Sequence, residues 1–250
     1  MNFDNIARVG FFMRKLFIFL LLFLFSCIDP NFARVDQSYR DTGIVVAGGN
    51  TSYRYLLYLP KDYGRQPSRQ YPLLVYLHGK SCRGYNLEKL KKYGPPYLVS
   101  KGWNFPFVIV SPQCPPDKIW NTDDWFPSLY RSLSDKYRID QKRIYLTGMS
   151  MGGSGAWALA IRHPEYFAAA IPMCGGWRTK NIKEIKNIPV WAFHGENDKI
   201  VSPTETEKMV NALREAGGKV RYSKLKGQGH SIHKIYEKRE IYEWLLKHRK

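Results

Sequence analysis

The chain has 250 residues, 44% of them hydrophobic and 24% charged, with a formal net charge of +18 at pH 7. This length and composition suit one folded α/β domain and exclude an intrinsically disordered chain. The basic excess favours anionic surfaces, but the Lys and Arg residues are dispersed. Because no recognition helix, zinc-finger spacing or RNA-binding aromatic pattern accompanies them, nucleic-acid binding is not predicted.

The first 26 residues have the pattern of a lipoprotein signal peptide. The basic pair Arg14-Lys15 precedes ten apolar residues, Leu16 to Phe25, a run too short to span a bilayer comfortably. The run leads into Ser26-Cys27, which resembles a bacterial lipobox, whose cysteine is lipidated and becomes the mature N-terminus. We expect an exported protein, lipid-anchored to the bacterial cell envelope through Cys27. A plain secretory signal or an uncleaved anchor is the alternative, and Met13 is a second candidate start.

A polar segment separates this leader from the first predicted strands. Residues 27–45 lack a clear periodicity, so we expect a tether there and a catalytic domain over residues 46–250. Tyr53 to Pro60 is predicted to be a strand, and so is the nearly all-apolar run from Tyr71 to Leu77. Continuous apolar runs bounded by turn signals indicate a parallel sheet buried on both faces.

Strand and helix patterns then alternate to the end of the chain. The predicted strands are Phe107 to Ser111, Arg143 to Thr147, Phe167 to Met173, Val190 to Phe193 and Val220 to Leu225. The predicted helices are Leu87 to Ser100 in part, broken at Pro95-Pro96, then Asp124 to Tyr137, a helix after Ser150, Pro203 to Ala216 and Glu237 to Lys247. This alternation predicts a doubly wound, mostly parallel sheet in a single α/β domain.

A nucleophile motif lies between the strand that starts at Arg143 and the helix that follows it. Gly148-Met149-Ser150-Met151-Gly152 matches G-x-S-x-G, in which a serine on a strained strand-to-helix turn projects its hydroxyl above the sheet. Three fixed positions also arise by chance. The strand before the motif and the helix after it favour the catalytic interpretation, so Ser150 is the predicted nucleophile.

Chain order selects the partners of the serine, because the acid and then the histidine follow the nucleophile in this kind of site. His230 lies in a glycine-rich loop directly after a predicted strand, which makes it the predicted general base, with His233 as the alternative. Asp198 lies in the loop after the strand Val190 to Phe193 and is the predicted orienting acid. Glu196 is the alternative acid.

The oxyanion of a tetrahedral intermediate needs two hydrogen-bond donors. The backbone N–H of Met151, the residue after the nucleophile, is the first expected donor. The N–H of Lys80, in the loop after the strand that ends at Leu77, is the second candidate. His78 is expected to brace that loop.

The remaining cysteines do not have metal-ligand spacing, and this chemistry requires neither a metal nor another cofactor. An exported protein allows a disulfide between Cys82 and Cys114, but sequence does not decide whether their Cα atoms lie within bridging distance. Cys174 follows an apolar run and is expected to be a buried thiol.

With these residues assembled, the chain resembles the α/β-hydrolase superfamily. More narrowly, it is similar to bacterial esterases related to dienelactone hydrolases, to prolyl-oligopeptidase catalytic domains and to feruloyl and polyhydroxybutyrate-type esterases. The matching stretches, in family order, are LLVYLHGKSCRGYN, FVIVSPQCP, RIYLTGMSMGGSGAWALAIRHPEYFAAAIPMCGG, IPVWAFHGENDKIVS and GQGHS. The resemblance implies that Ser150 is the nucleophile, Asp198 the acid and His230 the base.

Three features depart from these relatives. Lys80 and Ser81 stand where relatives often have small residues and an acidic one. The sequence has no preceding β-propeller, which disfavours the oligopeptidase alternative, and no apparent lid, which disfavours a long-chain lipase.

The resulting hypothesis is a serine carboxylesterase that cleaves small acyl or sugar-linked esters through an acyl-enzyme. An acetyl or feruloyl group on a polysaccharide is the expected form of the substrate. The alternatives are a serine peptidase that acts on short peptides and a non-catalytic, surface-binding lipoprotein. Four aromatic residues either line the acyl or sugar site or belong to the core: Trp120, Trp125, Phe126 and Trp177. The oligomeric state is left open.

Overall fold

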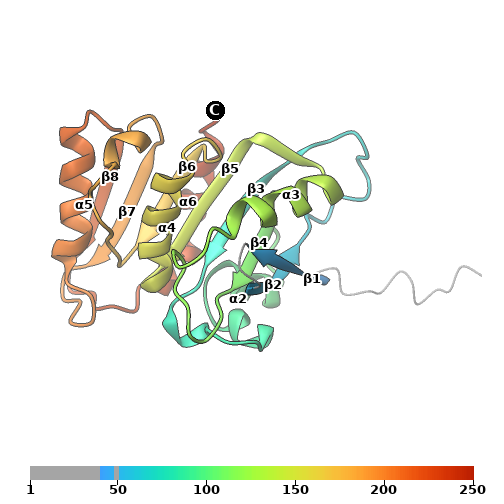
Figure 1. Cartoon of the computed structure of the whole chain (residues 1–250), viewed down its shortest axis with the longest axis horizontal. Coiled ribbons are helices and arrows are strands. Elements are labelled where there is room, and N and C mark those ends of the chain that lie inside the picture. The colour runs from blue at the N-terminus through green and yellow to red at the C-terminus, as the bar shows by residue number, and fades with distance from the viewer. Residues whose placement is uncertain (1–39, 48–50) are drawn as a thin grey trace, which may run out of the picture. The chain divides into compact units, whose positions relative to one another are not determined.

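The described structure is built around one mixed sheet (Figure 1). The structure is a computed structural model that describes residues 40–47 and 51–250. The predicted signal peptide, the lipidation site Cys27 and the tether up to residue 39 lie outside these residues. The strands of the described part form an eight-stranded sheet in the order β1-β2-β4-β3-β5-β6-β7-β8. Strands β3 to β8 run parallel, and β1 and β2 are antiparallel to their neighbours.

The bounds of these elements follow the predicted alternation closely. The strands are β1 (Arg40–Ala47), β2 (Thr51–Tyr58), β3 (Tyr71–Leu77), β4 (Val108–Gln113), β5 (Ile139–Met149), β6 (Ala169–Met173), β7 (Val190–Gly195) and β8 (Val220–Leu225). The α-helices are α2 (Gly94–Ser100), α3 (Phe126–Lys136), α4 (Met151–Arg162), α5 (Pro203–Glu215) and α6 (Arg239–Leu246). Short 3-10 helices are η2 (Lys80–Cys82), η3 (Leu87–Lys92), η4 (Ile182–Ile185) and η5 (His233–Glu237).

The end of the predicted tether is a strand. β1 begins at Arg40, so the tether prediction is wrong for residues 40–45, and the sheet starts before the expected boundary at residue 46. The run Gly43-Ile44-Val45-Val46 contains the β-branched residues that favour a strand, and β1 pairs with β2. An edge strand needs only one paired side, which explains why its polar beginning resembled a linker.

Two prolines start a helix where they were expected to break one. Pro95 and Pro96 occupy the first turn of α2, where the N–H groups have no partner inside the helix and the fixed φ of proline suits the helix. The preceding segment, η3, is a separate 3-10 helix capped by the side chain of Asn86. The predicted helical segment is therefore two elements joined at Tyr93.

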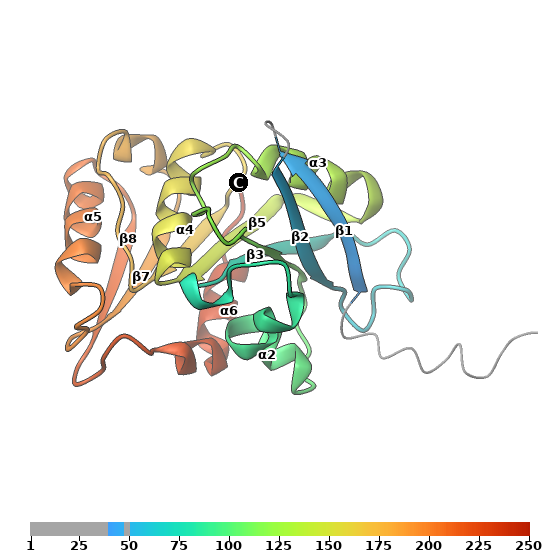
Figure 2. The same cartoon turned by 60° about the horizontal axis from the view of Figure 1, so that its bottom comes forward.

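Helices lie on both faces of the sheet (Figure 2), and the core lies between them and the sheet, as the apolar runs predict. On β3, Leu73 and Val75 pack in one cluster with side chains of α3, α4 and α5. Leu74 and Tyr76 point to the other face and pack in a cluster with α2 and α6. The seven residues of β3 are all buried. Burial at about 25 cal/mol per Å² of apolar surface makes these two clusters the main stabilising contribution.

Parallel register brings the ends of five strands, β3 and β5 to β8, to one edge. Leu77 pairs with Gly148, so the loop after β3 emerges beside the loop after β5. Met149 pairs with Met173, and Gly195 pairs with Leu225, so the loops after β6, β7 and β8 emerge at the same edge. Ligands of open α/β sheets bind at this carboxyl edge.

The described elements belong to one compact unit, which spans Ser38–Lys250. Within residues 40–47 and 51–250, none of the helices has both the length and the apolar character needed to cross a bilayer.

Candidate active site

Ser150 lies on a sharp turn between β5 and α4. Its φ of 61° and ψ of −121° are unusual for a residue with a side chain, and its N–H donates to the carbonyl of Met173 at 2.9 Å. The flanking glycines allow this turn. A Cβ on Gly148 would lie 2.4 Å from the carbonyl oxygen of Gly152, and one on Gly152 would lie 1.9 Å from that of Leu77. Strand and helix therefore approach as closely as the motif predicts.

The structure brings the three predicted catalytic side chains into one chain of hydrogen bonds. The hydroxyl of Ser150 lies 2.9 Å from Nε2 of His230. Nδ1 of the same imidazole lies 2.7 Å from Oδ2 of Asp198. An ionised carboxylate only accepts hydrogen bonds, so Nδ1 carries the proton and Nε2 is free to accept the serine proton.

Asp198 is held as a buried, ionised carboxylate. Its Oδ1 accepts the N–H groups of Ile200 and Val201 at 2.8 and 3.0 Å, and its side chain has no exposed surface. Burial raises the pKa of this carboxyl, but hydrogen bonds from His230 and from these two N–H groups outweigh burial and hold the pKa below its usual value. The carboxylate therefore stays charged at neutral pH beside the imidazole.

A second histidine, which sequence reasoning did not assign, also contacts the acid. Nε2 of His194 lies 3.0 Å from Oδ2 of Asp198, and Nδ1 lies 2.7 Å from Oγ1 of Thr206 on α5. Thr206 in turn donates to the carbonyl of Gly175. This fully buried chain therefore holds the same carboxylate oxygen, Oδ2, that His230 contacts. The His-Gly-x-x-Asp spacing at the end of a strand was the available signal.

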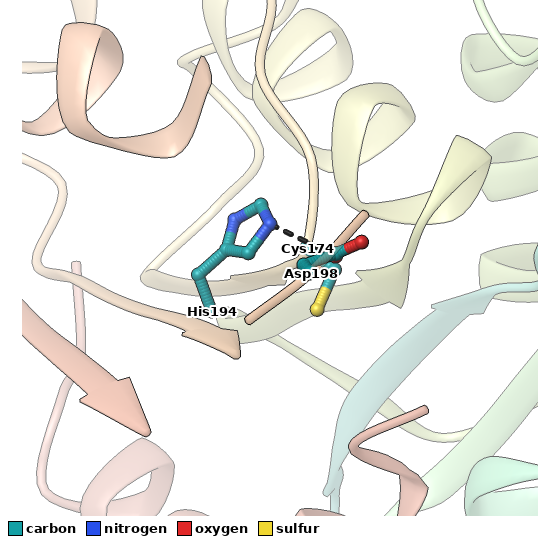
Figure 3. A group of neighbouring side chains, drawn as sticks. All are labelled: Cys174, His194 and Asp198. Atoms are coloured by element: carbon teal, nitrogen blue, oxygen red, sulfur yellow. Dashed lines mark hydrogen bonds and ion pairs between the residues drawn. The ribbon is translucent and has the colours of Figure 1, made fainter. Parts of the chain in front are cut away.

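Cys174, His194 and Asp198 lie together, and their ligand atoms are within 4.8 Å of one another (Figure 3). Their chemistry does not suit a metal. Burial raises the pKa of the Cys174 thiol to about 12, and that thiol donates to the backbone oxygen of His230. The hydrogen bonds described above already occupy the imidazole and the carboxylate. This group supports the positions of Asp198 and His230 instead.

The loop after β3 lies directly against Ser150. A Cβ on Gly79 would lie 3.6 Å from the Cβ of Ser150. His78, 1% exposed, holds this loop: its Nδ1 donates to the carbonyl of Gly79, and its Nε2 accepts the N–H of Cys114. Burial lowers the pKa of His78 to about 4, so the ring is neutral at pH 7. These contacts agree with the bracing role expected of His78.

Two backbone N–H groups stand beside the serine. Met151 is the first residue of α4 and Lys80 the first of η2, so both N–H groups precede any partner within their own helix. Neither has a hydrogen-bond partner in the part of the chain that the structure describes. They are the groups expected to bind an oxyanion.

Ser150 and His230 open into a cavity of about 300 Å³. Its other lining residues include Lys80, Tyr93 and His233, and the exposed Ile200 stands at its edge. A larger cavity of about 490 Å³ lies between Trp103 and α6 and contains none of the predicted site residues. We place the chemistry at the smaller cavity, because only this one combines a nucleophile, a base and free N–H donors.

The alternatives left open by the sequence lie elsewhere. Glu196 is exposed and accepts the N–H of Gly227, away from the imidazole of His230. His233 stacks on Tyr93, and the imidazole that forms a hydrogen bond with Ser150 is that of His230. Cys82 and Cys114 are free, buried thiols, so the disulfide that the sequence left open does not form.

The four aromatic residues that could have lined the site belong to the core, where three are buried and one is partly buried: Trp120, Trp125, Phe126 and Trp177. Tyr93, which does line the cavity, was missed. The sequence offered one signal for it: Tyr93 directly precedes Gly94-Pro95-Pro96, in the segment after β3 that also contains Lys80.

Comparison with known proteins finds a family match over part of this domain. Residues 123–242 match the Dienelactone hydrolase family. A bifunctional acetylxylan esterase/xylanase from Neocallimastix patriciarum is 27% identical over 150 residues, which are 58% of this chain and 22% of that protein. A putative esterase, NocK, from Nocardia uniformis subsp. tsuyamanensis is 28% identical over 171 residues, which are 62% of this chain and 47% of that protein. The chain thus spans less than half the length of these curated relatives.

Among solved structures, a thermostable esterase is 33% identical, with a TM-score of 0.74 over 86% of this chain and 64% of that one. The predicted fold class, the α/β-hydrolase fold, and the predicted relation to dienelactone hydrolases are therefore confirmed.

Proposed function

We propose that this chain, which carries a dienelactone hydrolase family domain over residues 123–242, is a serine carboxylesterase that forms an acyl-enzyme on Ser150. The observation that carries this proposal is the hydrogen-bond chain from Ser150 through His230 to Asp198, with distances of 2.9 and 2.7 Å. A serine on a nucleophile elbow, a histidine with its proton on the far nitrogen and a charged acid together suit acyl transfer.

The reaction follows from this geometry. The Ser150 oxygen attacks the ester carbonyl while Nε2 of His230 takes its proton, and the charge of Asp198 stabilises the imidazolium. The N–H groups of Met151 and Lys80 donate to the oxyanion, each contributing about 3 kcal/mol to the transition state. The imidazolium protonates the departing alcohol, and water, activated by the same imidazole, then releases the acid from Ser150.

The expected substrate is a small acyl group on a sugar. The acetylxylan esterase/xylanase among the relatives supports this choice, and so does the open cavity of about 300 Å³, which leaves room for an alcohol larger than the acyl group. We also propose that lipid on Cys27 holds the enzyme at the bacterial cell envelope. That second proposal depends on the lipobox alone, and loss of [³H]palmitate incorporation in Cys27→Ala is its test.

The experiment that tests the activity is a burst assay with p-nitrophenyl acetate on the wild-type protein and on Ser150→Ala. A burst equal to the enzyme concentration, absent from a folded Ser150→Ala, is expected. Rapid cleavage of alanyl p-nitroanilide with no ester turnover would show that the protein is a peptidase and not an esterase. No turnover of either compound would leave a non-catalytic binding protein as the remaining hypothesis.

A further inference from the structure

Two cavities at the carboxyl edge of the sheet share one wall. The catalytic cavity and a second cavity of about 80 Å³ are both lined by Tyr93 and His233. The two rings are stacked, with centroids 4.2 Å apart and planes 13° apart. A ligand that extends from Ser150 past this aromatic pair therefore reaches the second cavity.

The aromatic pair is held in place from both sides. Gly94, next to Tyr93, has a φ of +66°, and a Cβ there would lie 2.6 Å from the ring of Tyr76, so only glycine fits. His233 begins η5, three residues after His230, which ties the pair to the loop of the proposed base. Burial lowers the pKa of His233 to about 4, so its ring is uncharged at neutral pH. Its buried Nδ1 has no partner in the described part of the chain.

Exposed aromatic surface surrounds the pair. Tyr93 is 37% exposed and Tyr97, which lines the second cavity, is 36% exposed. Both come from the segment after β3, which also carries the proposed oxyanion donor. Partly exposed aromatic rings at the wall of a cavity offer the apolar faces on which sugar rings stack.

Positive charge accompanies these rings. Lys80 lines the catalytic cavity, and Lys92 and Lys234 line the second. Glu237 is the acidic residue that lines the second cavity, and no acidic residue lines the first. None of the three lysines has an ion-pair partner among residues 40–47 and 51–250. The lysines are thus available to a carboxylate on the ligand.

We propose that the Tyr93–His233 pair, with Lys80, Lys92 and Lys234, forms a subsite for a uronic-acid unit, so that the natural ester is carried by an acidic polysaccharide. This inference deepens the proposed function and rests on ester hydrolysis at Ser150. The sugar next to the esterified one stacks on the aromatic pair. Its carboxylate is bound by Lys92 and Lys234 beyond the pair.

Binding is measured first, without turnover, on full-length Ser150→Ala by calorimetry. The probes are hexagalacturonate and its fully methyl-esterified form, which keeps the same sugar chain without the charges. We expect hexagalacturonate to bind at least tenfold more tightly at 50 mM salt, and the difference to shrink at 500 mM salt because exposed charges are then screened. Equal affinities, or a preference that salt does not change, would overturn the subsite.

The double variant Lys92→Glu/Lys234→Glu then tests whether the preference for an acidic sugar depends on these two lysines. Its matched control is Lys136→Glu/Lys142→Glu, which makes the same charge change on exposed residues at the amino end of β5, opposite the site. The readout is the ratio of kcat/KM on acetylated homogalacturonan to kcat/KM on acetylated xylan. We expect this ratio to fall about tenfold in the first pair only, because two attractions become repulsions.

The two proposals fail in different ways. A burst with p-nitrophenyl acetate together with equal rates on both polymers would remove the subsite and leave the esterase. An equal fall of the ratio in both lysine pairs would assign the preference to net charge and also overturn the subsite. An absent burst with selective binding of hexagalacturonate would remove the esterase and support the binding site.

Discussion

The two sides of the site around Ser150 are built differently. On the interior side, Asp198 and His194 have fully buried side chains, and every polar atom described there has a hydrogen-bond partner. On the open side, Tyr93 is 37% exposed and Ile200 is 75% exposed, and Lys80 has no ion-pair partner in the described part of the chain. In the proposed reaction, the interior side positions protons and the open side meets the substrate.

This difference separates reaction from selectivity. A buried polar network tolerates little change, because removing one partner leaves another group unsatisfied at a cost of about 1–3 kcal/mol. Exposed side chains change with little effect on folding, usually within about 0.5 kcal/mol. If the proposed reaction takes place here, we expect the same interior to serve many esters and the residues of the open side to decide which ester is used.

Asp198→Asn tests the interior side most severely. The amide keeps the size of the carboxylate but favours the wrong tautomer of His230, so kcat on p-nitrophenyl acetate is expected to fall about 10⁴-fold. Glu196→Gln is the matched control, since Glu196 lies two residues away and binds only the N–H of Gly227. A larger loss in the control than in Asp198→Asn would move the acid role to Glu196.

Lys80 tests whether the open side contributes to the reaction through its backbone. Lys80→Pro removes the N–H at the first position of η2, where proline fits, whereas Lys80→Ala keeps the N–H. The proline variant is expected to have a kcat about 10² to 10³ times below that of the alanine variant. Equal kcat values for the two variants would exclude this N–H as an oxyanion donor.

Buried His78 is expected to make the free energy of unfolding depend on pH. Its pKa is about 4 in the folded protein against 6.5 for an ordinary histidine, so between these values only the unfolded chain binds the proton. The free energy of unfolding should therefore fall by about 3 kcal/mol between pH 6.5 and pH 4. His78→Gln, whose amide oxygen can still accept the Cys114 N–H, should lose this part of the pH dependence in urea titrations. Parallel pH curves for the two proteins would contradict a buried neutral ring.

Ile200→Ser is expected to have the smallest effect, and this effect should appear in acyl-chain preference and not in stability. The residue is 75% exposed, so the free energy of unfolding should change by less than about 0.5 kcal/mol. Because Ile200 lines the catalytic cavity, the preference for p-nitrophenyl butyrate over acetate should fall, by about threefold for a lost apolar contact. A large stability loss with no change in preference would show that Ile200 belongs to the core.

The sequence predicts the interior side better than the open side, for physical reasons. Ser150, Asp198 and His230 each lie after a strand of the sheet, and parallel register brings those strand ends to one edge, so their proximity follows from local patterns. Tyr93 meets His233 across two separate loops, and no periodicity encodes such a contact. β1 was missed because an edge strand has only one paired side, so its polar start resembles a linker.

His194 shows an intermediate case. Its place in His-Gly-x-x-Asp was visible, but its role depends on Thr206, which α5 brings to the network from another part of the chain. Long-range hydrogen bonds of this kind depend on packing that a single sequence does not specify.

The buried thiols give the molecule a built-in set of reporters. Burial raises the pKa of Cys82, Cys114 and Cys174, so each stays a protonated thiol that reacts slowly with alkylating reagents. Cys82 lies in the loop after β3, Cys114 follows β4, and Cys174 lies beside the acid. The labelling rate at each thiol would therefore measure how often that part of the fold opens, without any engineered probe.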